Sequence, residues 1–139
     1  MERPLKLTFL ADTHYYSKKA LGVSGRQYEL RSGSDQKCLA ETEEIITAAF
    51  EEIGNSDTDA VMIAGDLTND GERVCHEEFR KLARGLAQKK PLYLITATHD
   101  WCCDGNPRRY DGDMVFHDVP TLSSESLYDF IVTLGQSRQ

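Results

Sequence analysis

Three short apolar runs, each followed at once by polar residues, organise the chain. They cover residues 5–11, 60–64 and 92–97. The middle run is apolar at every position, which is typical of a strand buried on both faces of a parallel sheet. Between the runs, apolar residues recur every three or four positions, which predicts amphipathic helices. The pattern predicts the order strand-helix-strand-helix-strand, with a further helix at the end.

The helices are predicted over about residues 34–53, 71–88 and 123–134. Ser34 or Asp35 can cap the first of them. Its apolar stripe consists of Leu39, Thr42, Ile45, Ile46, Ala49, Phe50 and Ile53. The stripe of the second helix consists of Cys75, Phe79, Leu82, Ala83 and Leu86.

Two segments, 15–34 and 101–122, lack this periodicity and are predicted to be long loops. The first carries four basic residues and is either a solvated loop or a lid that faces a substrate. The second contains Arg108 and Arg109, which form either a solvated turn or a pair that contacts a substrate phosphate.

Strands and helices that alternate in this order form a parallel sheet with right-handed crossovers. We therefore expect an α/β fold in which a parallel sheet of βαβαβ order is flanked by helices. Residues that directly follow the strands emerge at one edge of such a sheet, and this is where open α/β folds bind ligands.

Composition narrows the class of protein. A chain of 139 residues is most simply one domain, and its net charge of -7 argues against binding nucleic acid by bulk charge. Its apolar runs are too short to span a membrane, and its start lacks an apolar signal region. The cysteines, with no Cys-x-x-Cys spacing, are interpreted as free thiols, which predicts a cytoplasmic location.

Polar groups that can bind metal follow all three predicted strands. The motifs are Asp12-Thr13-His14, Gly65-Asp66 and Thr98-His99-Asp100. Carboxylate oxygens and imidazole nitrogens suit Mn, Fe or Zn. Asp12 and His14 stand two residues apart in an extended segment, so both can reach one ion. Asp66 can bridge that ion to a second one.

Such a centre predicts phosphate chemistry. Two ions about 3.5–4 Å apart can activate a shared water and hold the oxygens of a phosphate during in-line attack. His99 would hold or supply a proton for the leaving group, and Asp100 would orient its imidazole.

At this point the chain resembles the calcineurin-like metallophosphoesterases. Members of that family carry the motifs Asp-x-His, Gly-Asp-x-x-Asn/Asp and Gly-Asn-His-Asp/Glu at the ends of their strands. The resemblance implies Asp12, His14 and Asp66 as metal ligands, His99 as the catalytic histidine, and the first half of the family's αββα sandwich. The sequence of residues 65–72 is similar to that of bacterial members that act on cyclic nucleotides and other phosphodiesters.

Two departures from the family pattern qualify this expectation. Thr98 stands where the family has an asparagine ligand. The centre of this chain is therefore expected to be either dinuclear, as in the family, or mononuclear. The family's later Gly-His-x-His block is missing, since His76 is expected on a helix surface and His117 in a loop. We therefore expect a single domain over residues 1–139 that is truncated at its C-terminus.

The leading functional hypothesis is metal-dependent hydrolysis of phosphate mono- or diesters, with a metal-bound hydroxide attacking a phosphorylated small molecule. The alternative is a truncated or degenerate member with little activity, which binds metal weakly or needs a missing segment or partner. A three-stranded sheet leaves an edge and a face uncovered, which predicts self-association. A phospho-receiver domain is the third class, but His14 and His99 occupy the edge where it needs an acidic pair and a lysine.

Overall fold

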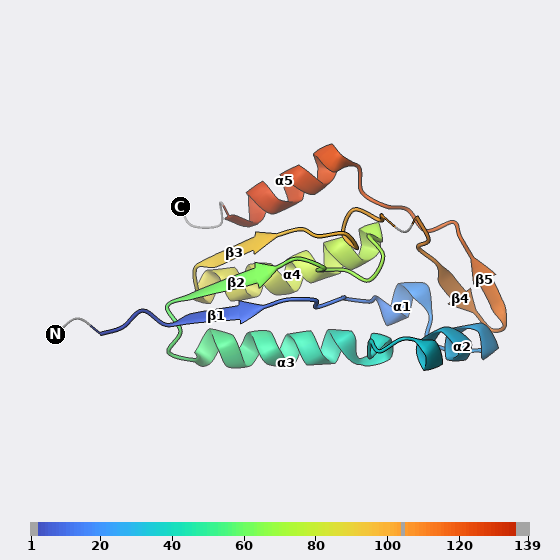
Figure 1. Cartoon of the computed structure of the whole chain (residues 1–139), viewed down its shortest axis with the longest axis horizontal. Helices are drawn as coiled ribbons and strands as arrows, with labels where there is room; N and C mark the ends of the chain where they lie inside the picture. Colours follow the sequence, from blue (N-terminus) through green and yellow to red (C-terminus); the bar gives the residue numbers. More distant parts are fainter. Residues whose placement is uncertain (1–2, 104, 136–139) are drawn as a thin grey trace.

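The computed structural model describes residues 3–103 and 105–135, so the expected domain end at Gln139 lies outside the described residues. Its centre is a parallel sheet in the order β1-β2-β3 (Figure 1). The strands are β1 (Leu7–Leu10), β2 (Ala60–Ala64) and β3 (Leu92–Ile95). Helices alternate with these strands, so the predicted α/β fold with a parallel βαβαβ sheet is confirmed.

Three long helices pack around this sheet and build the core with it. They are α3 (Thr42–Asn55), α4 (Arg73–Lys89) and α5 (Ser124–Gly135). The rings of Phe50 in α3 and Phe79 in α4 meet edge to face, with centroids 5.9 Å apart, and both belong to the buried cluster that includes Val61 and Ile63 of β2. Helix α5 packs beside α4 and β3. The predicted helices 71–88 and 123–134 are confirmed within two residues at each end.

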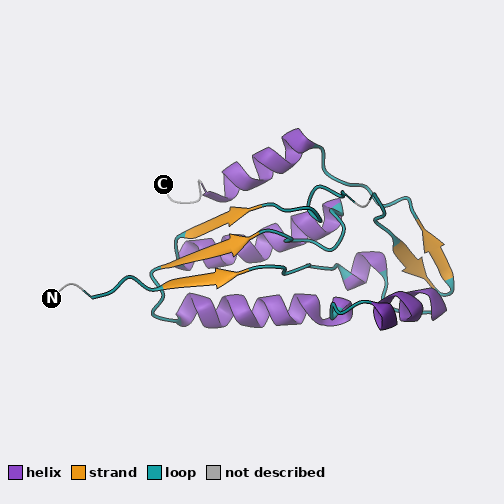
Figure 2. Ribbon diagram, viewed as in Figure 1, coloured by secondary structure: helices purple, strands orange, loops and turns teal. Residues whose placement is uncertain are grey.

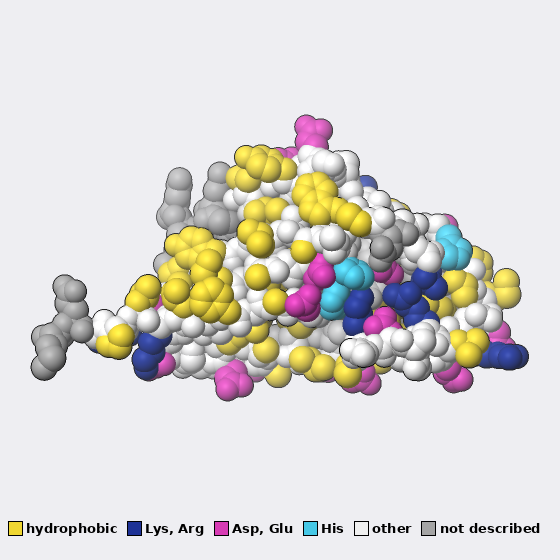
Figure 3. Space-filling view, viewed as in Figure 1, with side chains coloured by type: hydrophobic (Ala, Val, Ile, Leu, Met, Phe, Trp, Pro, Cys, Tyr) yellow, Lys and Arg dark blue, Asp and Glu magenta, His cyan; other side chains and the backbone are white. Residues whose placement is uncertain are grey.

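The expectation that the middle strand is buried on both faces is wrong. Val61 and Ile63 are buried, but Met62 between them is 38 % exposed. Phe9 and Tyr93 lie opposite Met62 in the neighbouring strands and are exposed as well. Helix α5 borders this face, because Ile131 and Leu134 line a pocket together with Met62. Among the described residues the rest of the face is open, which leaves the hydrophobic patch on the sheet in Figure 3. An uncovered sheet face was expected, and here the structure confirms it.

The two segments predicted as loops contain short regular elements. Helices α1 (Lys18–Leu21) and α2 (Arg26–Ser34) occupy the first, while strands β4 (Arg109–Asp111) and β5 (Met114–Phe116) form an antiparallel pair in the second. They lie together at one end of the molecule (Figure 2). Tyr28 of α2 and Tyr110 of β4 hold them together, with ring centroids 5.5 Å apart.

Helix α3 begins at Thr42, well after the predicted caps at Ser34 and Asp35. The Asp35 carboxylate accepts a hydrogen bond from the Lys37 backbone N–H at 3.1 Å, which favours a turn over a continuous helix. A 3₁₀ turn, η1 (Leu39–Glu41), then leads into α3. The Thr42 hydroxyl accepts a hydrogen bond from the Tyr16 N–H at 2.9 Å, so a residue distant in sequence fixes the helix start.

Among the described residues, no helix combines the length and the apolar composition that crossing a membrane would require.

Candidate metal centre

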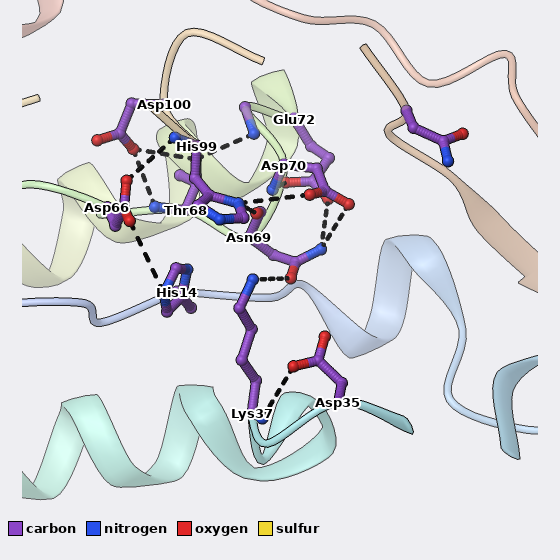
Figure 4. Close-up of polar contacts among 12 residues, drawn as sticks. His14, Asp35, Lys37, Asp66, Thr68, Asn69, Asp70, Glu72, His99 and Asp100 are labelled. Atoms are coloured by element: carbon purple, nitrogen blue, oxygen red, sulfur yellow. Dashed lines mark hydrogen bonds and ion pairs between the residues drawn. The ribbon is translucent and has the colours of Figure 1, made fainter. Parts of the chain in front are cut away.

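The loops that follow β1 and β2 continue side by side beyond the strands. Three backbone N–H groups donate across the gap: Asp12 to the Gly65 carbonyl at 3.2 Å, His14 to the Asp66 carbonyl at 2.9 Å, and Tyr15 to the Leu67 carbonyl at 2.9 Å. The loop after β3 joins them, because the His99 N–H donates to Oδ1 of Asp66 at 3.0 Å. The three predicted motifs therefore meet at the carboxyl edge of the sheet (Figure 4).

The backbone at this edge has an unusual conformation. Asp12, His14 and Asp66 have φ values of 54°, 42° and 48°, in the left-handed region that residues with side chains seldom adopt. Such conformations cost free energy, persist where surrounding bonds enforce them, and cluster at functional sites. Here the backbone bonds between the first two loops supply that constraint.

Three side chains converge between these loops. One ligand atom each of His14, Asp66 and His99 lies within 4.8 Å of the others. Nε2 of His14 is 4.0 Å from Oδ2 of Asp66, and the two imidazole rings meet edge to face with centroids 4.7 Å apart. The carboxylate-to-ring distance is longer than a hydrogen bond, so the ligand atoms face a common point without being bonded to each other.

The chemistry of this group fits a divalent metal ion. Burial, followed by the nearby charges of Lys37 and His99, lowers the pKa of His14 below its ordinary value of 6.5. His14 is therefore neutral at pH 7, the form in which imidazole binds metals. Two imidazole nitrogens and a carboxylate oxygen suit Zn, Mn or Fe.

The composition of the group differs from the expected ligand set. His14 and Asp66 come together as predicted, but the third member is His99, which sequence reasoning assigned to catalysis alone. The Asp12 side chain is 69 % exposed, with Oδ1 3.9 Å from Nε2 of His14. The left-handed φ values of Asp12 and His14 break the extended geometry from which their common direction was inferred. Asp12 thus lies beside the group of three, as near to Nε2 of His14 as Asp66 is, and its role as a metal ligand stays a prediction.

Asp100 has a different neighbourhood from the one expected. It is 2 % exposed, and its carboxylate accepts hydrogen bonds from the N–H groups of Leu67, Thr68 and Ala97 at 3.0–3.1 Å. The Thr68 hydroxyl donates a fourth bond at 3.1 Å. Asp100 thereby ties the loop after β3 to the loop after β2.

Contacts to the His99 ring come from the loop after β2. Nδ1 of His99 bonds the Asn69 carbonyl oxygen, and Oδ1 of Asp70 lies 3.5 Å from the same nitrogen. Asn69 and Asp70 therefore contact the imidazole directly, and the orienting role of Asp100 stays a prediction. A carbonyl oxygen only accepts, so Nδ1 carries the proton and Nε2 is the free ring nitrogen.

A buried acidic network behind this ring was missed from the sequence. Nδ2 of Asn69 donates to Asp70 at 3.1 Å and to Glu72 at 3.3 Å, while the Asp70 N–H donates to Glu72 at 2.9 Å. Burial raises the pKa of Glu72. The signal was the polar run over residues 68–72, which also has the composition of an ordinary turn.

The remaining histidines and Thr98 lie outside the group of three. His76, expected on a helix surface, is fully buried: its Nε2 is 3.3 Å from the Asp100 carbonyl oxygen and its ring meets Phe130 edge to face. The prediction fails because α5 covers the side of α4 that carries His76. His117 and Thr98 are exposed. The second metal position stays a prediction.

Basic side chains border the centre, as Figure 3 shows beside the histidines. Nζ of Lys37 donates to Oδ1 of Asn69 at 3.4 Å, and Arg31 pairs with Asp70 at 3.3 Å. Arg109 instead pairs with Asp118 and stacks over the Phe116 ring. The cations nearest the centre therefore come from the segment 15–38, and the predicted pairing of Arg109 with a substrate phosphate stays without support.

Comparison with known proteins agrees with this geometry. A family model described as calcineurin-like phosphoesterase matches residues 5–136. No curated protein matches the chain. The matched region contains the whole sheet and all three motif loops. The chain belongs to the calcineurin-like phosphoesterase family.

Proposed function

We propose that this chain hydrolyses phosphate monoesters or diesters of small molecules with the help of a divalent metal ion. The observation that carries the proposal is the convergence of His14, Asp66 and His99 within 4.8 Å at the carboxyl edge of the sheet. Membership of a phosphoesterase family supports the reaction class. The sequence of residues 65–72 resembles that of phosphodiesterase-type members, so diesters are tested as well as monoesters.

His14 and Asp66 are assigned to hold the ion, with Mn, Fe and Zn as candidates. A bound divalent ion supplies charge neutralisation on phosphate oxygens and lowers the pKa of water. Asp66 has one oxygen for this task, because the other accepts the His99 N–H. His14, neutral at pH 7 through its lowered pKa, offers a ring nitrogen.

His99 is assigned to the leaving group. Its Nδ1 is fixed by the Asn69 carbonyl oxygen and flanked by Asp70, so Nε2 is the atom that can hold a proton for the leaving oxygen. Asp70 and Asn69 act as positioning residues. Because His99 also lies within ligand distance of His14 and Asp66, its role is decided by experiment.

The test compares hydrolysis of 4-nitrophenyl phosphate and bis(4-nitrophenyl) phosphate by wild-type, Asp66→Asn and His99→Asn chains with Mn²⁺. We expect hydrolysis that a chelator abolishes and that Asp66→Asn lowers more than a hundredfold, since metal stabilisation of the transition state is worth several kcal/mol. His99→Asn should lower kcat while Mn²⁺ affinity persists. Activity indifferent to chelator and to Asp66→Asn would refute the proposal. Loss of Mn²⁺ binding in His99→Asn would make His99 a ligand.

A second candidate is a domain with little turnover alone, which completes its site through a second copy or a partner. The exposed apolar residues of the sheet, Phe9, Met62 and Tyr93, favour it because such surfaces mark sites of association. Specific activity that rises with protein concentration, in step with dimer formation in sedimentation runs, would support this candidate. Constant specific activity of a monomer would exclude it.

A further inference from the structure

A cavity of about 820 Å³ opens directly beside the metal centre. One end is formed by Asp12, Thr13 and His14 of the loop after β1. The other end runs along α3 and is apolar, lined by Leu10, Ile45, Ile46, Ala49 and Phe50. The segment before α3 adds a polar side to the lining, which includes Asp35 and Lys37. A volume of this size holds a small organic molecule, and apolar walls with placed polar groups are typical of ligand sites.

Lys37 lies between the two ends. It lines the cavity, and Figure 4 shows its side chain rising from the segment before α3 to Asn69, beside His14. Its charge is close enough to contribute to the lowered pKa of His14. An ammonium group in this place complements a phosphate that is held at His14 and Asp66.

The apolar end is open to ligands. Ile45 is 53 % exposed, although it belongs to the apolar stripe of α3, while Ile46 and Phe50 behind it are buried. A ligand that covers Ile45 and contacts the apolar residues beside it would remove apolar surface from water.

We propose that this cavity selects phosphoesters whose organic group is bulky and apolar. The phosphate would lie at the metal centre with Lys37 on one of its oxygens, and the apolar group would lie along α3 on Ile45, Ala49 and Phe50. This inference rests on the proposed function for the position of the phosphate, and it adds a substrate class and Lys37 as a substrate-binding residue.

Binding of phosphonates tests the inference without any turnover. Phenylphosphonate and methylphosphonate are titrated calorimetrically into the full chain loaded with Mn²⁺. We expect the wild-type chain to bind phenylphosphonate about tenfold more tightly, because the ring leaves water for an apolar wall. Lys37→Met should weaken both ligands by the same factor, and Lys37→Arg should restore most of the affinity.

Two variants locate the ring in the cavity. Ala49→Trp fills the apolar end and should remove the phenyl preference while methylphosphonate binding persists. Ala48→Trp is the matched control, since Ala48 is exposed on the same helix and does not line the cavity. Ile45→Asp, at a position that is 53 % exposed, replaces that test if Ala49→Trp fails to fold. Its added charge weakens binding of both phosphonates alike, so the ratio of the two affinities is compared, and the phenyl preference should fall.

The outcomes separate this inference from the proposed function. A phenyl preference that Ala49→Trp abolishes supports the inference even if no ester is hydrolysed. Equal affinity for the two phosphonates, or a preference that survives both Ala49→Trp and Ile45→Asp, overturns it even if hydrolysis depends on Asp66. Absence of binding by either phosphonate overturns it as well.

Discussion

The backbone N–H of His99 donates to Oδ1 of Asp66 over 3.0 Å, so the two central residues of the site are bonded to each other. Asp66 follows β2 and His99 follows β3, and this bond fixes the distance between their loops. Oδ2 of Asp66 is left to face His14, 4.0 Å from Nε2. One carboxylate therefore both positions the histidine loop and contributes to the metal group.

The buried Asp100 carboxylate holds the loops after β2 and β3 together, and its replacement by an amide should lower stability. Asp100→Asn leaves one acceptor oxygen where the carboxylate accepts four hydrogen bonds, and it turns an NH₂ group toward buried donors. We expect unfolding in urea to show a loss of about 2–4 kcal/mol, the cost of unsatisfied buried donors. Asp118→Asn, which alters an exposed ion pair, is the control and should leave stability unchanged within error. Equal stability of the two variants would contradict this role for Asp100.

Gly65 is required by both its conformation and its surroundings. Its φ is +83°, and an added Cβ would lie 2.5 Å from Cβ of Ala97 in the loop after β3. Gly65→Ala should therefore lower the unfolding free energy by about 2–4 kcal/mol, through backbone strain and overpacking.

Gly85 in α4 provides the matched control. A Cβ there meets nothing within 4 Å, so Gly85→Ala should raise stability by up to about 1 kcal/mol through helix propensity. Thermal unfolding of both variants measures the contrast. A Gly65→Ala chain as stable as Gly85→Ala would show that the β2 and β3 loops are not closely packed.

The stability of the fold should fall in mild acid because of His76. Burial lowers the pKa of this histidine, and its Nδ1 has no hydrogen-bond partner among the described residues. Above about pH 6.5 the residue is neutral in both folded and unfolded chains. Below that pH the unfolded chain takes up the proton first, so the unfolding free energy decreases until the pH reaches the folded-state pKa.

Urea unfolding at several pH values between 7 and 5 measures this effect, with His76→Gln as the comparison. The variant should show a shallower decline. Some decline should remain, because the pKa of His14 is also lowered by burial. The raised pKa of Glu72 acts in the opposite direction near and above its ordinary value of 4.5, since the folded chain binds that proton first. Identical slopes for wild type and His76→Gln would contradict the prediction.

The fold was predictable where local patterns and topology agree. Apolar runs and helical periodicity gave the alternation of elements, and parallel strands bring their carboxyl ends to one edge whatever the details of the loops. The proximity of His14 and Asp66 could be predicted from this common edge alone. The direction of the Asp12 side chain could not be predicted in this way, because it depends on a left-handed backbone that bonds to the Gly65–Leu67 segment enforce. The role of Asp12 as a ligand stays a prediction.

The missed elements depend on contacts between distant parts of the chain. Tyr28 in α2 is buried against Tyr110 in β4, and the backbone at Gly25 approaches the Gly112 carbonyl. The β4–β5 pair did carry a local signal, since its two-residue turn Gly112-Asp113 is a pair typical of hairpins. His76 had no such signal, because only the position of α5 shows that this side of α4 is buried.

Binding of a divalent ion at His14 and Asp66 is the central claim, and equilibrium dialysis against Mn²⁺ tests it most directly. The control His117→Ala alters an exposed histidine outside the group of three. Wild type and this variant should each bind one Mn²⁺ ion per chain, with equal affinity. Asp66→Asn, which keeps an oxygen able to accept the His99 N–H, should stay folded and bind Mn²⁺ at least about a hundredfold more weakly. Equal Mn²⁺ affinity of Asp66→Asn and His117→Ala would contradict the claim.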